Sequence, residues 1–181
     1  MSAAVVFGGA GFIGSFFAHY LLSNRLFDTV YIYDLESLSD KPFSFRKKIL
    51  DGYSKLVEVR GDVRKPIELH PQEPVTLVAN FAAIHREPGH NPSEYYETNL
   101  KGASNICEWA NSVDCQDIIF TSSISPYGSS EEERDESSQP VPTTAYGGSK
   151  LVAEKIHEIW LAQDSETKHL VIVRPGVVFG P

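Results

Sequence analysis

A tyrosine and a lysine lie four positions apart in the stretch Tyr146-Gly147-Gly148-Ser149-Lys150. On a helix, side chains four apart share one face, with their Cβ atoms about 5–6 Å apart. An ammonium group near a phenol stabilises the phenolate, and moving a tyrosine pKa from about 10 to near 7 requires roughly 4 kcal/mol. Such a tyrosine can take the proton of a substrate alcohol while hydride leaves the carbon. Taken singly, the pair is more typical of surface packing, so this interpretation depends on the surrounding motifs.

Hydroxyl groups gather in a second stretch, Thr121-Ser122-Ser123-Ile124-Ser125-Pro126-Tyr127-Gly128. It follows the apolar run Ile118-Ile119-Phe120, which predicts a strand, so the hydroxyls lie at the carboxyl end of that strand. Together with the tyrosine–lysine pair, this arrangement favours catalysis over surface packing. The acids Glu131-Glu132-Glu133 follow in the next loop, and we interpret them as a solvated loop rather than a metal site.

Glycines three apart mark the beginning of the chain, at Gly8, Gly11 and Gly14. The apolar run Val5 to Phe7 before them predicts a buried strand, and apolar residues recur at helical spacing from Phe12 to Leu21. A turn without Cβ atoms lets a ligand approach the unpaired N–H groups of the helix start, where the helix dipole favours a pyrophosphate. Strand, glycine turn and helix in this order predict dinucleotide binding. The glycines alone would fit a structural turn equally well.

An aspartate at the end of the next strand supports the dinucleotide interpretation. That strand, Val30 to Tyr33, ends at Asp34, which follows Gly14 by 20 positions (34 − 14). A dinucleotide fold needs a carboxylate here to accept the ribose 2′-hydroxyl. The carboxylate would repel a 2′-phosphate, so we predict NAD rather than NADP. The alternative is that Asp34 only caps a loop.

Strands and helices alternate along the chain. Apolar patterns predict further strands at 56–59, 76–81, 118–120 and 170–173, a short helix at 45–50, and long helices at 93–111, capped by Ser93, and 144–162. This alternation predicts an α/β fold of Rossmann type, a doubly wound parallel sheet with helices on both faces. We expect residues 1–181 to form one NAD-binding domain.

The composition is that of an ordinary globular domain, with 181 residues of which 41% are apolar and 22% charged. A formal net charge of −8 argues against a nucleic-acid partner. No apolar run approaches membrane-spanning length, and no signal-peptide pattern precedes the first strand. Cys107 and Cys115 lack metal-ligand spacing and are poor candidates for a disulfide. We therefore expect a soluble cytoplasmic protein without a metal site.

Short motifs spread over nearly the whole chain resemble those of one known family, in the same order. They are Gly8-Gly9-Ala10-Gly11-Phe12-Ile13-Gly14, Gly61-Asp62-Val63, Phe81-Ala82-Ala83, Asn99 with Gly102, Ser122-Ser123 before Tyr127-Gly128, Tyr146 to Lys150, and Arg174-Pro175 through Gly180-Pro181. Together they resemble the extended short-chain dehydrogenase/reductase family, in its NAD-dependent nucleotide-sugar epimerase/dehydratase branch with UDP-glucose 4-epimerase-like members. The substrate-binding part of that family has no counterpart in these 181 residues, so we expect the N-terminal portion of a longer enzyme or a truncated fragment.

The resemblance implies a role for each matching residue. Tyr146 corresponds to the general acid–base, Lys150 to the residue that lowers its pKa and holds the nicotinamide ribose, and Ser123 to the hydroxyl donor to the reacting sugar oxygen. Ser122 is the neighbour most easily confused with Ser123. The implied cofactor-binding residues, besides Tyr146 and Lys150, are Gly8, Gly11, Phe12, Ile13, Gly14, Asp34, the adenine contacts Asp62 and Val63, and Phe81, Ala82, Ala83, Asn99 and Pro175 around them.

Departures from the family pattern narrow the chemistry. Ile124 and Ser125 occupy the places where the 4,6-dehydratases carry an Asp-Glu pair, and decarboxylases of the family tend to have an acid at the place of Ser125. Without these acids, elimination and decarboxylation lack a participant, and reversible oxidation at C4 remains. Val177 stands where many relatives have an asparagine that reaches the phosphates of the sugar nucleotide. His85 is either a phosphate or substrate contact or an incidental loop residue.

The predicted activity is that of an NAD-dependent epimerase acting at C4 of a UDP- or related sugar through transient hydride transfer to bound NAD. Two alternatives remain open: an NAD(P)-dependent 4-keto nucleotide-sugar reductase or dehydrogenase, and a non-catalytic dinucleotide-binding module. The resemblance further implies a homodimer formed through a four-helix bundle. In this interpretation the two long helices have more apolar surface than one sheet face covers, contributed by Ile106, Trp109, Ile156, Ile159 and Trp160.

Overall fold

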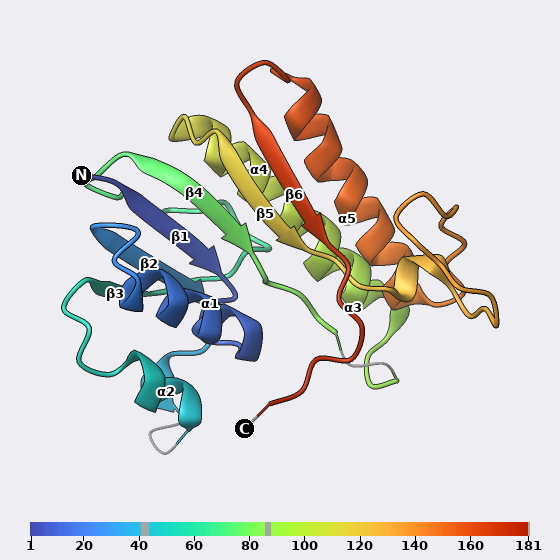
Figure 1. The fold of residues 1–181 in the computed structure, drawn as a ribbon, viewed down its shortest axis with the longest axis horizontal. Coiled ribbons are helices and arrows are strands. Elements are labelled where there is room, and N and C mark those ends of the chain that lie inside the picture. The colour runs from blue at the N-terminus through green and yellow to red at the C-terminus, as the bar shows by residue number, and fades with distance from the viewer. Residues whose placement is uncertain (41–43, 86–87, 181) are drawn as a thin grey trace.

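A parallel sheet organises the part of the chain that the structure, a computed structural model, describes: residues 1–40, 44–85 and 88–180. In this part the sheet has six strands in the order β3-β2-β1-β4-β5-β6, and every neighbouring pair is parallel (Figure 1). The strands are β1 (Ala3–Phe7), β2 (Thr29–Asp34), β3 (Leu56–Arg60), β4 (Val75–Asn80), β5 (Asp117–Thr121) and β6 (His169–Val173). The predicted Rossmann-type α/β fold is confirmed.

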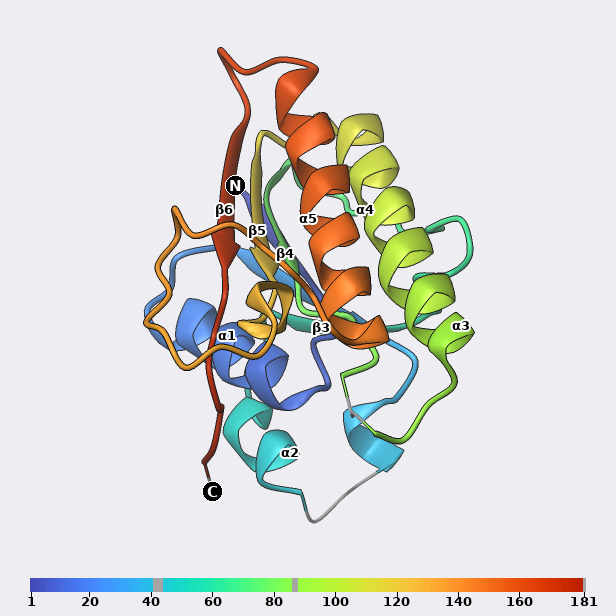
Figure 2. The same ribbon diagram turned by 90° about the vertical axis from the view of Figure 1, so that its right-hand side faces the viewer.

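Helices lie on both faces of the sheet (Figure 2). Those helices are α1 (Phe12–Ser23), α2 (Phe45–Leu50), α3 (Pro92–Tyr95), α4 (Lys101–Ser112) and α5 (Ala145–Ala162). Because side chains alternate along a strand, β1 supplies both cores. Val5 packs in the same core as Trp109 of α4, whereas Val6 packs in the other core with Leu21 of α1. All five side chains of β1 are buried, which explains its unbroken apolar run.

The strand order reverses direction between β1 and β4. After β1 the chain enters α1 on one face of the sheet, and after β4 it runs toward α3 at the other face. The two exits adjoin, since a Cβ atom on Gly8 would lie 2.7 Å from the backbone nitrogen of Ala82. In doubly wound sheets such a reversal opens a crevice at the carboxyl ends of the strands, where ligands bind.

The predicted helix 93–111 begins earlier and is less regular than expected. Ser93 is not its cap: the helix starts at Pro92, and the N-cap is Asn91. The carboxylate of Glu94 accepts a hydrogen bond of 2.7 Å from the Asn91 backbone N–H. Proline suits the first helical position because its missing N–H has no helical partner there. A π-helical turn, η2 (Tyr96–Leu100), separates α3 from α4, so the three together form one interrupted helix.

Most of the apolar surface predicted for a dimer interface is used inside the chain. Ile106, Trp109 and Trp160 are buried in the core between the sheet and the helices α4 and α5, and Ile156 is partly buried against it. Only Ile159 of the predicted set remains largely open, with 63% of its surface exposed. The prediction that these helices have more apolar surface than one sheet face covers is therefore wrong for three of the five residues.

The remaining predictions on metals, membranes and cysteines concern the same described residues. None of their helices is both long enough and apolar enough to cross a bilayer. No cluster of three or more His, Cys, Asp or Glu side chains among them is arranged to hold a metal ion. Cys107 and Cys115 are buried free thiols, and burial raises their pKa values to about 12 and about 11.

Candidate active site

The glycines of the loop between β1 and α1 have different roles: two are required by backbone packing, and one leaves room for a ligand. Gly8 has a φ of +74°, and a Cβ atom on Gly14 would overlap the carbonyl oxygen of Gly8. Both glycines are therefore required by the protein's own backbone. A Cβ atom on Gly11 would meet only the Gly8 oxygen, at 3.0 Å, so this side of the loop faces open space. Gly11 is the position where a phosphate can come close to the backbone.

The start of α1 offers backbone donors at this open side. The first helical hydrogen bond runs from the Ser15 N–H to the Gly11 carbonyl oxygen, at 3.0 Å. Helix geometry leaves the N–H groups of Phe12 and Ile13 without a carbonyl partner within the helix. Gly11 is the N-cap residue of α1 and has no side chain that could cap these amides. Unpaired amides at the positive end of a helix suit the pyrophosphate of a dinucleotide, so the residues present fit the cofactor.

Asp34 holds the glycine loop from the end of β2. One carboxylate oxygen accepts a 3.0 Å hydrogen bond from the Ala10 N–H, and the other accepts one of 3.1 Å from the Glu36 N–H. Burial raises the pKa of Asp34, against the lowering effect of these hydrogen bonds. The carboxylate also lines a groove of about 260 Å³ between Ile32 and Arg60. Asp34 thus holds the glycine loop and also borders a groove, which is compatible with the expected ribose contact.

Arg46 is a contact of the glycine loop that the sequence analysis missed. Its Nη1 atom, from α2, donates a 2.8 Å hydrogen bond to the carbonyl oxygen of Ala10. The two backbone groups of Ala10 are therefore held by opposite charges, the N–H by Asp34 and the carbonyl by Arg46. The sequence signal for this contact was a basic residue in the predicted short helix 45–50, which follows Asp34.

The two predicted adenine contacts, Asp62 and Val63, differ in which of their atoms a ligand could reach. Asp62 forms a close ion pair with Arg64, at 2.8 Å, and hydrogen bonding by Arg64 lowers its carboxyl pKa. Val63 is buried in the core, and a Cβ atom on Gly102 would lie 2.9 Å from one of its methyl groups. Val63 can therefore offer a ligand only its backbone.

The segment after β4 lies directly against the glycine loop. Phe81 packs its ring edge-on against Phe17 of α1, with ring centroids 5.2 Å apart, and its N–H continues the pairing of β4 with Phe7. The Ala82 N–H donates to the side chain of Asn80 at 3.2 Å. Phe81, Ala82 and Ala83 are all partly exposed, which is the placement expected of residues that line a cofactor.

Asn99 connects the segment after β4 to helix α5. Its Oδ1 atom accepts from the Ile84 N–H at 2.9 Å, and its Nδ2 atom donates to the Ile84 carbonyl at 3.2 Å and to the Ser149 hydroxyl at 2.9 Å. Asn99 is buried, and it belongs to the π-helical turn η2. Such turns recur at functional sites because they redirect side chains out of the helical register. Here the redirected amide fixes the neighbour of Lys150.

The serine stretch after β5 forms a local hydroxyl pair. The Ser123 and Ser125 hydroxyl oxygens are 3.0 Å apart, and the Ser125 N–H donates to the Ser123 hydroxyl at 3.1 Å. Ser123 is half-buried, whereas Ser122 is buried and its hydroxyl has no hydrogen-bond partner among the described residues. The geometry therefore distinguishes the two neighbours: Ser123 is the accessible hydroxyl.

Tyr146 and Lys150 lie in the first turns of α5, which Thr144 caps through the Gly147 N–H at 3.1 Å. Tyr146 is half-buried, and its ring centroid is 6.0 Å from that of Tyr95. The Lys150 ammonium is buried, donates to the Thr121 carbonyl oxygen at 2.6 Å and lies 4.3 Å from the centre of the Phe120 ring. Burial lowers the pKa of Lys150 to about 7, partly opposed by the charge of Glu154.

Two buried polar groups below Lys150 were not anticipated from the sequence. Glu154 is completely buried and forms a bidentate ion pair with Arg174, with N–O distances of 2.9 and 2.6 Å. His157 is also completely buried, stacks on Phe120 with ring centroids 4.1 Å apart, and lies 3.3 Å from the Asn80 amide nitrogen. The available signal was spacing, because Lys150, Glu154 and His157 fall on one face of a helix.

The segment after β6 brings the remaining motif to the same edge. The Pro175 carbonyl accepts a 3.1 Å hydrogen bond from the Ile124 N–H, so this segment continues the sheet alongside the serine stretch. Val177 is 89% exposed, and His85 is also exposed. Pro181 lies outside the described residues. The structure thus places Pro175 at the site and leaves Val177 and His85 at its margin.

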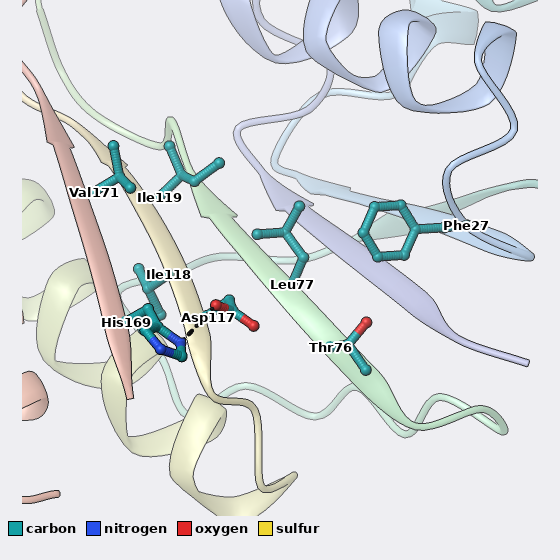
Figure 3. A pocket seen from close by; sticks show the side chains of 8 residues that line it. All are labelled: Phe27, Thr76, Leu77, Asp117, Ile118, Ile119, His169 and Val171. Carbon is teal, nitrogen blue, oxygen red and sulfur yellow. Dashed lines mark hydrogen bonds and ion pairs between the residues drawn. The ribbon is translucent and has the colours of Figure 1, made fainter. Parts of the chain in front are cut away.

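A second groove lies away from this edge of the sheet (Figure 3). It has a volume of about 350 Å³ and runs over the amino-terminal half of β4, β5 and β6, on the face that carries α1. Apolar side chains such as Leu77, Ile119 and Val171 line most of it, with one ion pair of 3.0 Å between His169 and Asp117. We place the site at the carboxyl edge instead, because the glycine loop, Ser123, Tyr146 and Lys150 all converge there.

Known proteins resemble this chain over nearly its whole length. The pattern of the NAD dependent epimerase/dehydratase family matches residues 4–181. The N-acetyl-alpha-D-glucosaminyl-diphospho-ditrans,octacis-undecaprenol 4-epimerase of Escherichia coli O157:H7 is 29% identical over 177 residues, which are 97% of this chain and 49% of that protein. The UDP-glucose 4-epimerase of Lacticaseibacillus casei is 30% identical over 162 residues, covering 83% of this chain and 44% of its own length.

A solved structure shows the same fold at low identity. The UDP-glucuronic acid 4-epimerase from Bacillus cereus, in complex with NAD, superposes with a TM-score of 0.82 at 23% identity. The match covers 99% of this chain and 58% of that structure. The chain thus spans about half the length of the curated relatives it matches.

Proposed function

The chain belongs to the NAD-dependent epimerase/dehydratase family of enzymes, and from this premise we propose that the protein inverts the configuration at C4 of a nucleotide sugar, a UDP-sugar or a close relative. NAD, the cofactor of the family, supplies a reversible hydride acceptor when bound, so the reaction requires no net oxidant. One observation carries the proposal most strongly. Ser123, Tyr146 and Lys150 come from the segment after β5 and the start of α5, and these elements are joined by the hydrogen bond from Lys150 to the Thr121 carbonyl oxygen.

Tyr146 is the group we assign to proton transfer. It lies one helical turn before Lys150, and the Lys150 ammonium is held in a dry environment between a carbonyl oxygen and an aromatic ring. A positive charge in such an environment acts strongly on a nearby phenol and favours the phenolate. Tyr146 would take the proton of the C4 hydroxyl as hydride leaves C4 for the cofactor. After the keto sugar has turned over and hydride has returned to the opposite face of C4, Tyr146 would give the proton back to the C4 oxygen.

Ser123 is the group we assign to the reacting oxygen. Its hydroxyl is half-buried, accepts from the Ser125 N–H and donates to the Ser125 hydroxyl at 3.0 Å; rotation of the Ser123 hydroxyl away from Ser125 would direct its proton to the sugar oxygen. A hydrogen-bond donor aimed at the developing charge on that oxygen stabilises the transition state. Ser123 and Tyr146 would then contact the same hydroxyl from two sides.

The absence of acids beside Ser123 favours epimerisation over elimination or decarboxylation. Neither Ile124 nor Ser125 has a carboxylate that could make a further proton transfer. Ile124 is 51% exposed, and the Ser125 hydroxyl is hydrogen-bonded to Ser123. Elimination of water from the sugar requires a second acid–base pair next to the hydride step. With one proton-transfer group, oxidation and return at a single carbon is the reaction this site can complete.

The decisive experiment compares the wild-type full-length protein with Tyr146→Phe. Inversion of UDP-glucose and of UDP-N-acetylglucosamine at C4 is followed by NMR with catalytic NAD. Turnover should fall about 10²–10⁴-fold in the variant, because one general acid–base group is lost while its ring still packs. NAD affinity measured by calorimetry should stay near the wild-type value.

Tyr20→Phe is the matched control, since Tyr20 lies on α1 and is 56% exposed. It should leave turnover unchanged. Equal turnover in Tyr146→Phe would remove this residue from its role. Consumption of one NADH per sugar would favour a 4-keto sugar reductase, and NAD binding without turnover in any form would favour a binding module.

A homodimer is the assembly we propose for the protein. After the burial of Ile106, Trp109 and Trp160, the outward apolar side chains of α5 are Val152, 42% exposed, and Ile159, 63% exposed. They are seven residues apart and therefore share one face of the helix. Two copies can pair these faces into a four-helix bundle with α4. Light scattering of Ile159→Glu at high concentration should show a monomer where the wild type shows a dimer.

A cytoplasmic location agrees with the state of the cysteines. Cys107 and Cys115 are both free and buried, and free thiols persist in reducing compartments. We place the protein in the cytoplasm on this basis. Cell fractionation that recovers it outside the cytoplasm would contradict the proposal.

A further inference from the structure

Arg174, directly after β6, connects the three elements that surround the predicted catalytic residues. Its Nε and Nη2 atoms donate to the two carboxylate oxygens of Glu154 on α5. Its Nη1 atom donates to the hydroxyl of Tyr127 at 2.6 Å, and the guanidinium carbon lies 4.8 Å from the centre of that ring. Tyr127 ends the short 3-10 helix η3 (Ser125–Tyr127), which follows Ser123. A single side chain therefore joins the end of β6, the serine stretch and helix α5.

The ion pair also balances charge below Lys150. Glu154 lies four residues after Lys150 on the same face of α5, and the two residues are 0% and 2% exposed. A buried carboxylate this close attracts an ammonium strongly, because the surrounding dielectric is low. Among the described residues, Arg174 is the one cation that forms an ion pair with Glu154.

We propose that Arg174 is a positioning residue for the reaction: it binds Glu154 and cancels its charge, so that the positive charge of Lys150 acts on Tyr146. The inference rests on the proposed function, in which Tyr146 transfers the proton. It goes beyond that function because it explains how a lysine can serve a tyrosine while a carboxylate lies one turn behind it. The charge of Glu154 raises the pKa of Lys150, which agrees with electrostatic contact between the two groups.

The other polar groups near Lys150 and Tyr146 do not provide this balance. His157 on α5 is neutral near pH 7, because burial lowers its pKa to about 4. From β5, Lys150 meets only the Thr121 carbonyl and the Phe120 ring in the contacts that the structure shows. On the side of α3, Tyr146 faces the ring of Tyr95, behind which lie His90, at 5.7 Å between ring centroids, and Glu94, 3.6 Å from His90.

The size of the effect follows from helix geometry. Tyr146 and Glu154 are eight residues apart on α5, which is about 12 Å along the axis. An uncompensated charge at that distance, with an effective dielectric constant of about 20, shifts a pKa by about one unit. While Lys150 stays protonated, loss of Arg174 should therefore raise the pKa of Tyr146, and loss of Glu154 should lower it by a similar amount.

The test is a titration of Tyr146 in the full-length protein labelled with ¹³Cζ-tyrosine, with the Tyr146 signal assigned by its loss in Tyr146→Phe. Arg174→Gln should raise the Tyr146 pKa by about one unit, and Glu154→Gln should lower it by about one unit. The double variant removes both charges and should return close to the wild-type value. Lys155→Gln is the control, because Lys155 forms an exposed pair with Glu158 on the same helix.

A purely structural role for Arg174 predicts a different result. In that case the double variant would be at least as disturbed as Arg174→Gln, and this outcome overturns the inference, as does an unchanged Tyr146 pKa in both single variants. If Arg174→Gln does not fold, Glu154→Gln decides the sign of the effect, since Arg174 keeps its bond to Tyr127 there. Wild-type turnover without these shifts overturns the inference and keeps the proposed function, whereas shifts without C4 inversion support the charge balance and contradict the proposed function.

Discussion

We assign cofactor binding to the part of the fold formed by β1, α1 and β2 (the cofactor half), which offers backbone amides and one carboxylate. We assign catalysis to the part formed by β5, α5 and β6 (the catalytic half), which instead buries Lys150, Glu154 and His157 beneath its edge. Backbone amides keep their dipoles at any pH and need no distant partner. Buried ionisable groups oppose folding unless they are paired or neutral. The cofactor half should therefore tolerate changes of pH that disturb the catalytic half.

The two halves also differ in the elements that hold their residues in place. The glycine loop is held from the elements that follow it, by Asp34 of β2, 24 positions after Ala10, and by Arg46 of α2, 36 positions after Ala10. Lys150 depends on Thr121, 29 positions away, and Tyr127 depends on Arg174, 47 positions away. Function on the catalytic side is thus linked to the correct packing of three elements.

The largest expected effect is a loss of stability in the catalytic half. Arg174→Met leaves the Glu154 carboxylate buried and unpaired, which should reduce the free energy of unfolding by about 3–5 kcal/mol. The double variant Glu154→Leu/Arg174→Met removes both charges and should be much closer to the wild type. Urea unfolding at pH 7 measures both. A single variant as stable as the double variant would show that the pair is not a buried charge pair.

The second largest expected effect is a loss of stability of the catalytic half at low pH. Burial lowers the pKa of His157 from 6.5 to about 4. Between these values the unfolded chain binds the proton and the folded chain does not, so stability is lost as the pH falls from about 6.5 to 4, by about 3 kcal/mol in total. Urea unfolding of His157→Gln should show a flatter pH dependence in this window. His70→Gln, at an exposed histidine, is the matched control.

In the cofactor half, two glycines should respond differently to the same methyl group. Gly14→Ala places its Cβ against the Gly8 carbonyl and 2.8 Å from the Gly9 Cα, so it should reduce stability by about 1–3 kcal/mol. Gly11→Ala should cost less than about 1 kcal/mol but weaken NAD binding, because the methyl group enters the open side of the loop. Thermal unfolding and calorimetry separate the two effects. Equal loss of stability in both would contradict this division.

The smallest effect concerns cofactor choice. Asp34→Asn keeps the size of the side chain but removes the charge that favours a ribose 2′-hydroxyl and repels a 2′-phosphate. We expect NAD affinity to fall about tenfold, which corresponds to about 1.4 kcal/mol, and NADP affinity to rise. Calorimetry of both cofactors with wild type and variant measures the change. Stronger NADP than NAD binding by the wild type would refute the role assigned to Asp34.

Much of the fold follows from patterns that are visible within a few residues. The predicted helices 45–50 and 144–162 agree closely with α2 and α5, because apolar periodicity is a local signal. The cap at Ser93 was wrong because a proline can begin a helix, which moves the cap back to Asn91. The π-helical turn that directs Asn99 toward Ser149 has no comparable sequence signal.

Apolar residues showed the limit of pattern reading most clearly. Periodicity placed Ile106, Trp109 and Trp160 correctly on helices, but it could not say whether each faced the sheet, the neighbouring helix or solvent. The structure packs α4 and α5 side by side over one sheet face, which buries all three. Only the packing of elements against each other decides which apolar side chains remain for a partner.

The sequence by itself determined the β-α-β unit with its glycine loop and Asp34, and the spacing of Tyr146 and Lys150, because each depends on chain geometry within one or two elements. The tertiary structure decided which glycine faces open space, which serine hydroxyl is accessible, and which charge balances Lys150. Glu154 and Arg174 meet only after β6 has paired with β5 and α5 has packed over both. Buried charges are stable only when such pairs form, so their partners are selected by the completed fold and not by neighbouring residues.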